Sequence, residues 1–447
     1  MPARPRVVVG RAVVGCGGMR SCRLLRMPVD VVHAGKIASR LGRKAAQQLT
    51  PAGRRRRALE RAAIDAPTSR PGLHHVDEQG VVVTCGCRTH QHHSDTLVTP
   101  PVRQQTRPAE ELLRPGCGDT ERPAYTQPVG DAAARHEHDD EAAPVSAAAA
   151  ASECTPVEVA YYRVGPRVTD DNHTTVVFVH GFTLASDSFF LQVDYLQTVF
   201  PEVTSLLVDV RGHGRTGKVA PSLCTVEGTA DDVLATIAMH APRGRLILVG
   251  HSLGGMTVLN LLRRADSSVQ DRVAGVLLLS TAIESLASQG LPQVLASPVA
   301  NLVHDQMEIA PELAREFRTQ VAELLAPTLA ATVFYRDSTP YDIIEFHASM
   351  IHDTPLETIV GFFDDLQEHE ETAAGKLLRR LDGACVVGDK DHFTPLGQTD
   401  LICRTWTRAT RHVLRGVGHM VILEAPELVN RELGRLVART LPALTSQ

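Results

Sequence analysis

The stretch that decides the fold is Gly250-His251-Ser252-Leu253-Gly254-Gly255. It directly follows the apolar run 246–249 and directly precedes the helical pattern 256–264. A G-x-S-x-G sequence between a strand and a helix is typical of a nucleophile elbow, where a serine lies on a tight turn. Glycines on both sides leave room for that turn, and the helix start offers N–H groups to a developing negative charge. The sequence therefore predicts a nucleophilic serine at Ser252.

A serine nucleophile needs a base and an orienting acid, and with this elbow the acid precedes the histidine in the chain. Segment 388–395 reads Gly-Asp-Lys-Asp-His-Phe-Thr-Pro, between a late strand and a helix. Segment 416–420 reads Gly-Val-Gly-His-Met and follows the next predicted strand. Both lie at predicted carboxyl ends of strands, where open α/β sheets gather their active sites. The acid candidates are Asp389 and Asp391, and the base candidate is His419.

From about residue 155, short apolar runs alternate with longer helix-patterned segments. This alternation predicts an α/β fold with a mainly parallel sheet flanked by helices. Strands are expected at 157–164, 174–179, 205–210, 246–249, 273–279, 384–387 and 412–415, and helices at 188–200, 226–240, 253–264, 396–407 and 426–440. A long, largely helical cap insertion is expected at about 284–381. Its apolar segments 291–303 and 343–363 could cover the site as a lid.

The first third of the chain has a different composition. The whole chain holds 447 residues with a formal net charge of -5 and 43% hydrophobic residues, which excludes a collagen-like or wholly disordered protein. Residues 1–150, however, carry 22 Lys/Arg against 15 Asp/Glu and one aromatic residue. We therefore expect 1–154 to be a disordered extension and linker rich in Arg, Pro and Ala, and 155–447 to be the folded domain.

Several features of the chain bear on ligands and location. The run Arg54–Arg57 is read as a solvated charge cluster, so no nucleic acid is expected as a partner. Cys85, Cys87, His90, His92 and His93 are metal-ligand types, but no second half of a zinc site follows, so no metal is expected. No apolar run reaches the roughly 18 residues of a membrane span. The nine scattered cysteines favour a reducing, cytoplasmic location.

Five motifs in order make residues 155–447 resemble the α/β-hydrolase superfamily, in its serine esterase and lipase-like branch. They are Val179-His180-Gly181-Phe182, Asp209-Val210-Arg211-Gly212-His213-Gly214, the elbow at Ser252, the 388–395 segment, and Gly418-His419 followed by Leu423-Glu424-x-Pro426-Glu427. The resemblance implies Ser252 as nucleophile, His419 as base, and Asp391 rather than Asp389 as the orienting acid. It also implies an oxyanion hole formed by the backbone N–H groups of Phe182 and Leu253.

The resemblance also narrows the chemistry. Dehalogenases and epoxide hydrolases of the superfamily have aspartate at the elbow, where this chain has Ser252. A serine hydrolase of a small-molecule carboxylic ester or lipid-like acyl compound is therefore expected, without a cofactor or metal. Carbon–carbon bond hydrolysis, acyl transfer and a catalytically silent ligand receptor remain alternatives, and the oligomeric state stays open.

Residues near these motifs also have structural interpretations. His180 and His213 are expected to brace their loops by hydrogen bonds, and Asp209 and Arg211 to tie their loop down. The pair Asp231-Asp232 is interpreted as an exposed helix start.

Overall fold

The computed structural model describes residues 71–85, 156–286, 333–336 and 338–441. In these residues the centre is an eight-stranded sheet in the order β1-β2-β4-β3-β5-β6-β7-β8. Strands β3 to β8 run parallel, and β1 and β2 extend one edge by antiparallel pairing. The strands are β1 (Glu78–Cys85), β2 (Pro156–Val164), β3 (Thr174–Val179), β4 (Thr204–Val208), β5 (Arg245–His251), β6 (Val273–Leu279), β7 (Asp382–Gly388) and β8 (Ala409–Leu414). The prediction of an α/β-hydrolase-type sheet is confirmed.

The inner strands are short apolar runs because both faces of the sheet are covered by helices. Every residue of β3 and β4 is buried. One core cluster joins the sheet to α4 (Val226–His240), α5 (Leu253–Arg264) and α13 (Leu396–Thr405). A second cluster joins it to α3 (Phe190–Val199) and α15 (Pro426–Ala438). The short elements η3 (Ser186–Phe189), η4 (Pro221–Leu223), α6 (Ser267–Gln270) and α14 (Val421–Glu424) lie in the connections.

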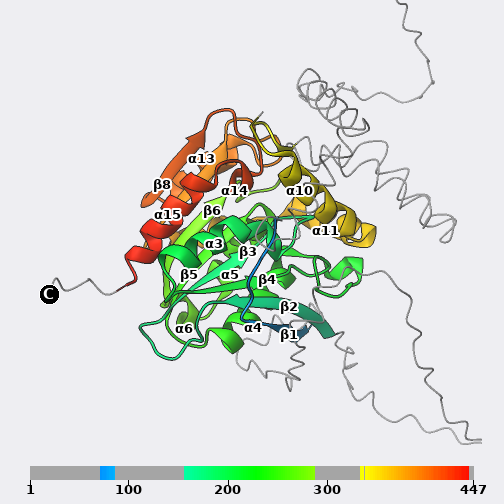
Figure 1. Cartoon of the computed structure of the whole chain (residues 1–447). Helices are drawn as coiled ribbons and strands as arrows, with labels where there is room; N and C mark the ends of the chain where they lie inside the picture. The colour runs from blue at the N-terminus through cyan, green and yellow to red at the C-terminus, as the bar shows by residue number, and fades with distance from the viewer. Residues whose placement is uncertain (1–70, 86–155, 287–332, 337, 442–447) are drawn as a thin grey trace, which may run out of the picture.

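Strand β1 corrects the expected domain boundary. We predicted that 1–154 takes no part in the folded domain, but β1 pairs with β2 along its whole length, from Glu78↔Arg163 to Cys85↔Pro156 (Figure 1). Val82 and Thr84 point into the molecule and are buried. The prediction is therefore wrong for residues 71–85. A lone β-branched run has no stability without its partner, and here the partner strand begins 71 residues after β1 ends.

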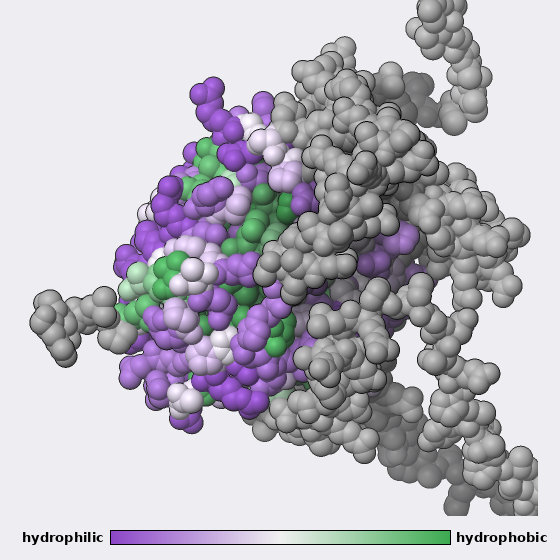
Figure 2. All heavy atoms as spheres, viewed as in Figure 1, coloured by the Kyte–Doolittle hydropathy of each residue, from purple (hydrophilic) through white to green (hydrophobic). Residues whose placement is uncertain are grey.

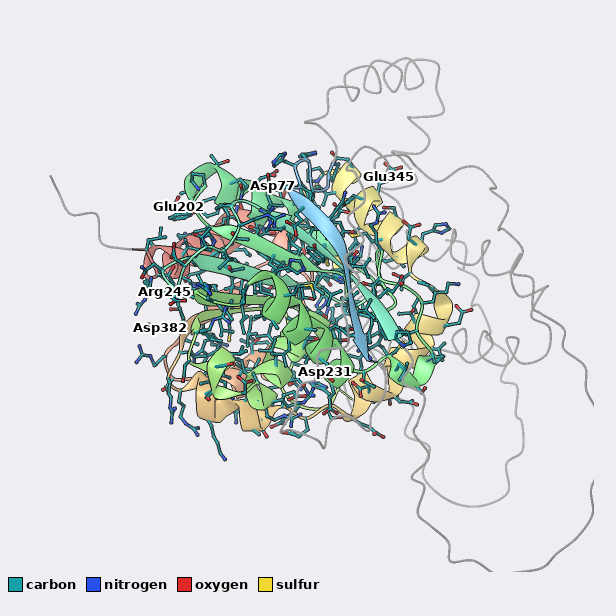
Figure 3. All side chains as sticks on the ribbon, turned by 90° about the horizontal axis from the view of Figure 1, so that it is seen from below. Asp77, Glu202, Asp231, Arg245, Glu345 and Asp382 are labelled. Carbon is teal, nitrogen blue, oxygen red and sulfur yellow. The ribbon has the colours of Figure 1, made fainter. Side chains whose placement is uncertain are left out.

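The cap insertion follows β6 and precedes β7. Its described parts contain α10 (Tyr341–Asp353), α11 (Leu356–Glu368), η5 (Thr372–Ala374) and α12 (Gly375–Leu378). Of the two predicted lid segments, 343–363 falls on α10 and α11, and 291–303 lies outside the described residues. Figure 3 shows Arg245 and Asp382, the first residues of β5 and β7, at the opposite side of the molecule from Glu345 of α10. The cap helices thus lie toward the carboxyl ends of the strands.

The surface is mostly hydrophilic on the face that Figure 2 shows, with hydrophobic residues in small patches. Val199 is the one exposed large hydrophobic side chain of the described residues. None of the described helices is long and apolar enough to cross a membrane. The described residues also hold no group of three or more His, Cys, Asp or Glu suited to a metal ion. Of the five clustered Cys and His residues near position 90, only Cys85 is described; Arg54–Arg57 are outside the described ranges.

Candidate active site

Ser252 lies on a strained turn between β5 and α5. Its backbone has φ +53° and ψ -119°, a conformation that costs of order 1–3 kcal/mol outside glycine and that surrounding contacts must impose. The Ser252 N–H donates to the Leu279 carbonyl at 3.0 Å. The Ser252 carbonyl accepts from the Gly255 N–H at 2.8 Å and from the Thr281 hydroxyl at 2.7 Å. Neighbouring β6 and the first turn of α5 therefore hold the elbow in place.

Glycines around Ser252 are required by close packing. A Cβ atom at Gly250 would collide with the Gly254 carbonyl, and one at Gly254 would collide with the Val179 carbonyl. A Cβ at Gly181 would lie 2.7 Å from His251 Nδ1 and 3.1 Å from Ser252 Cβ. The loop after β3 thus lies directly against the elbow, which brings Gly181-Phe182 beside Ser252.

Asp391 is the carboxylate that contacts His419. Its two oxygens lie 3.0 and 2.9 Å from His419 Nδ1. They also accept hydrogen bonds from the N–H groups of Phe393 and Thr394 and from the Thr394 hydroxyl, each at 2.9 Å. Burial acts to raise the pKa of Asp391, but His419 and the hydrogen bonds from Thr394 outweigh it, so the pKa is lowered. The carboxylate is therefore ionised and fixed at neutral pH.

The other acidic candidate has a different role. Asp389 is exposed and accepts a hydrogen bond from the Gly416 N–H at 2.7 Å. It therefore joins the two loops that follow β7 and β8, while Asp391, two residues on, is buried and contacts His419.

His419 is held by its backbone as well as by Asp391. Its carbonyl lies 3.1 Å from His251 Nε2, and its N–H donates to the Val333 carbonyl at 2.9 Å. Burial, and then the nearby His419, lower the pKa of His251 to about 3, so His251 is neutral and its Nε2–H donates. His251 thus supports the loop of His419.

The loop after β4 is braced as predicted. His180 Nε2 accepts from the Val210 N–H at 2.9 Å, and His180 Nδ1 donates to the Gly181 carbonyl at 2.8 Å. Asp209 accepts from the N–H groups of Ser186 and Arg215, both at 2.8 Å. Both ring nitrogens of His180 are occupied by backbone hydrogen bonds, so it positions the Gly181 loop.

The interpretation of Asp231-Asp232 as an exposed helix start is wrong. Both residues lie inside α4, and Asp232 is fully buried. Asp232 accepts hydrogen bonds from Arg211 Nε and Nη2 at 2.9 and 2.8 Å and from the Thr84 hydroxyl at 2.6 Å. The buried charge is stable because Arg211 neutralises it. The sequence carries no sign that Asp232 contacts Thr84 of β1, which lies far away in the chain.

Two residues near the site were not identified from the sequence. His347 of α10 is buried, and burial, followed by the nearby His419, lowers its pKa to about 3. Glu424 of α14 accepts a hydrogen bond from the Gly418 N–H at 2.8 Å, next to His419. Glu424 was part of the Leu423-Glu424-x-Pro426 motif, but the motif gave no reason to assign it a role. His347 lies in a cap segment that carries no motif.

Comparison with known families identifies the family of the chain. Residues 176–432, more than half of the chain, match the model of the "Alpha/beta hydrolase family". The chain therefore belongs to the α/β hydrolase family, as its motifs predicted.

Individual relatives are more distant. The chain is 28% identical to "Probable esterase PIR7A" of rice, Oryza sativa subsp. indica, over 177 residues, which are 39% of this chain and 64% of the rice protein. It is 26% identical over 261 residues to the "Dihydrolipoyllysine-residue acetyltransferase component of acetoin cleaving system" of Pseudomonas putida, covering 58% of this chain and 62% of that protein. The chain thus spans less than two thirds of the length of these relatives. A structure of a thermophilic esterase from Thermogutta terrifontis aligns with a TM-score of 0.49 and 22% identity, over 64% of this chain and 95% of the esterase.

Proposed function

We propose that this protein is a serine hydrolase of carboxylic esters or lipid-like acyl compounds. Ser252 is the nucleophile, His419 the general base and then acid, and Asp391 the carboxylate that orients His419. The observation that carries the proposal is the buried hydrogen bond between Asp391 and His419, 2.9 Å long, in the same structure as a strained serine at the start of α5. The name of the rice relative, a probable esterase, supports an ester as the substrate.

The hydrogen bond to Asp391 supports one arrangement of the proton on His419. A carboxylate can only accept, so Nδ1 of His419 carries the proton toward Asp391 and Nε2 is left to act as a base. Nε2 takes the proton of the Ser252 hydroxyl while Oγ forms a bond to the substrate carbonyl carbon. The imidazolium that results is stabilised by Asp391. His419 then returns the proton to the leaving alcohol as the ester bond breaks.

The negative charge on the carbonyl oxygen needs donors close to Ser252. The backbone N–H groups of Phe182 and Leu253 are the proposed oxyanion hole. Leu253 is the first residue of α5, where the positive end of the helix dipole lies. Phe182 follows Gly181, whose backbone packs against Ser252 Cβ. Each such donor contributes about 10²–10³ in rate.

The acyl-enzyme is then hydrolysed by a water molecule that His419 activates in the same way. None of these steps calls for a metal or cofactor. Passing the acyl group to an acceptor other than water is the second candidate function, and similarity to the Pseudomonas acetyltransferase component favours it over carbon–carbon hydrolysis.

Labelling with a fluorophosphonate tests the proposed nucleophile. We expect the wild-type protein to be labelled and to hydrolyse p-nitrophenyl esters, and Ser252→Ala to lose both because the variant lacks the proposed attacking oxygen. A panel of esters of increasing chain length measures the acyl preference, and added alcohols or thiols test transfer against hydrolysis.

Ser205→Ala is the matched control. Ser205 is a buried serine, the second residue of β4, and its hydroxyl has no hydrogen-bond partner in the described part of the chain. It should label like wild type. A folded wild-type protein that neither labels nor turns over any ester would contradict the proposal and favour a ligand receptor.

A further inference from the structure

Glu424 is a buried carboxylate that lies between the catalytic loop and the cap. It ends α14, which follows His419 in the chain, and is 4% exposed. Its Oε1 accepts a hydrogen bond from the Gly418 N–H at 2.8 Å. Gly418 directly precedes His419, so this bond fixes the backbone that carries the proposed base.

The second oxygen of Glu424 faces the cap insertion. Oε2 accepts from the N–H groups of Tyr335 and Arg336, at 2.8 and 2.6 Å. The guanidinium Nη1 of Arg336 also donates to the Glu424 carbonyl at 2.8 Å. One side chain therefore holds two segments that are more than 80 residues apart in the sequence.

Direct contacts between these two segments show that the junction is closely packed. The His419 N–H donates to the Val333 carbonyl at 2.9 Å. A Cβ atom at Gly418 would collide with the same carbonyl, so only glycine allows this approach. Residues 333–336 of the cap thus lie against the loop of His419, and Glu424 accepts hydrogen bonds from both.

We propose that Glu424 is a positioning residue for catalysis, which holds the loop of His419 and the cap segment 333–336 in one fixed arrangement. The inference rests on the proposed function, because it acts through His419. Its consequence is that the position of the base and the position of the cap are not independent. A movement of the cap segment reaches the loop of His419 through the Glu424 carboxylate as well as through the direct contact with Val333.

A carboxylate suits this position because it has two acceptor oxygens and no donor. Glutamine has the same shape but only one acceptor oxygen. Its amide NH₂ would face an N–H group, either that of Gly418 or those of Tyr335 and Arg336. Glu424→Gln therefore disrupts one side of the junction while leaving the side-chain volume unchanged.

The experiment compares Glu424→Gln with Glu432→Gln in the full chain. Glu432 is also buried, at 6% exposure, and is hydrogen-bonded to Arg435 at 2.8 Å, but it lies on α15 and takes no part in the site. Three quantities are measured: the rate of fluorophosphonate labelling per folded molecule, kcat and KM for p-nitrophenyl acetate and for a long-chain p-nitrophenyl ester, and the thermal midpoint.

We expect labelling and kcat of Glu424→Gln to fall about ten- to hundredfold, because misplacing a reacting group by about 1 Å can cost 10²-fold. KM for the small acetate ester should stay within about twofold of wild type. Glu432→Gln should label at the wild-type rate per folded molecule.

Two results would overturn the inference. One is a lower thermal midpoint in Glu424→Gln with an unchanged labelling rate per folded molecule. That result would mean that Glu424 has a purely structural role. The other is a loss confined to long-chain esters, which is an effect of the cap alone. Failure of the wild type to label is a separate outcome, since it contradicts the serine hydrolase and not the role of Glu424 alone.

Discussion

Two aspartates separated by one residue differ completely in what they contact. Asp391 is buried beside His419 and accepts three further hydrogen bonds, whereas Asp389 is exposed and contacts Gly416. Composition and spacing left both as candidates, and the family resemblance favoured Asp391. The geometry supports the same choice because only Asp391 can stabilise a positive charge on the imidazole.

Asparagine at these two positions separates their roles. We expect Asp391→Asn to lower kcat about 10⁴-fold, because an amide NH₂ facing Nδ1 favours the wrong tautomer of His419. Asp389→Asn should keep kcat within about threefold of wild type, because the amide oxygen of asparagine can still accept the hydrogen bond from the Gly416 N–H. Initial rates with p-nitrophenyl acetate measure both variants, and circular dichroism confirms that both are folded. Equal losses in the two variants would exclude Asp391 as the orienting acid.

At the scale of elements, the main addition to the expected fold is β1. Glu78 at its start forms ion pairs with Arg163 and Arg167 and accepts a hydrogen bond from the Tyr161 hydroxyl at 3.0 Å. Just before it, the Leu73 N–H donates to Asp187 of η3 at 2.9 Å. The segment 71–85 is therefore attached both to the sheet and to η3.

Alternation along β1 gives a matched pair of variants. Val82 is buried, while its neighbour Val83 is only partly covered. Val82→Asp should lower the free energy of unfolding by more than about 3 kcal/mol, because it buries an unpaired charge. Val83→Asp should cost about 1 kcal/mol through strand preference alone. Urea unfolding measures both, and equal midpoints would mean that β1 does not pack on the core.

At the scale of the whole molecule, buried histidines predict that stability depends on pH. Burial is the main cause that lowers the pKa of His213, His251 and His347 to about 3, against 6.5 in an unfolded chain. Unfolding therefore takes up protons between these values. The stability that they contribute is present above pH 6.5 and is lost as the pH falls toward 3.

His347→Phe isolates one of these groups. His347 already packs edge-on against Phe334, with ring centroids 5.3 Å apart, and its Nδ1 has no hydrogen-bond partner in the described residues. Phenylalanine should fit in the same place. Because it does not titrate, the variant takes up one proton fewer than wild type when it unfolds in this pH range. Between pH 6 and 5, the free energy of unfolding should then fall by about 1.2 kcal/mol less than in wild type. Identical slopes would mean that His347 is already charged in the folded state.

The sequence alone determined the central part of the fold and the composition of the candidate site. The elbow, the 388–395 segment and the loop of His419 each lie where a strand ends, so local pattern and chain order were enough to place them. The strands from 174–179 to 273–279 were predicted close to their observed bounds. They too have a local signal, because each is a short apolar run between turns.

Only the tertiary structure decided the contacts between distant segments. The pairing of β1 with β2, the burial of Asp232 against Arg211 and Thr84, and the position of Glu424 between Gly418 and the cap all join residues far apart in the chain. A single sequence carries no local signal for such contacts, because each partner alone looks like an ordinary strand, an exposed acid or a helix end. Their free energy arises only when packing removes water from both partners at once.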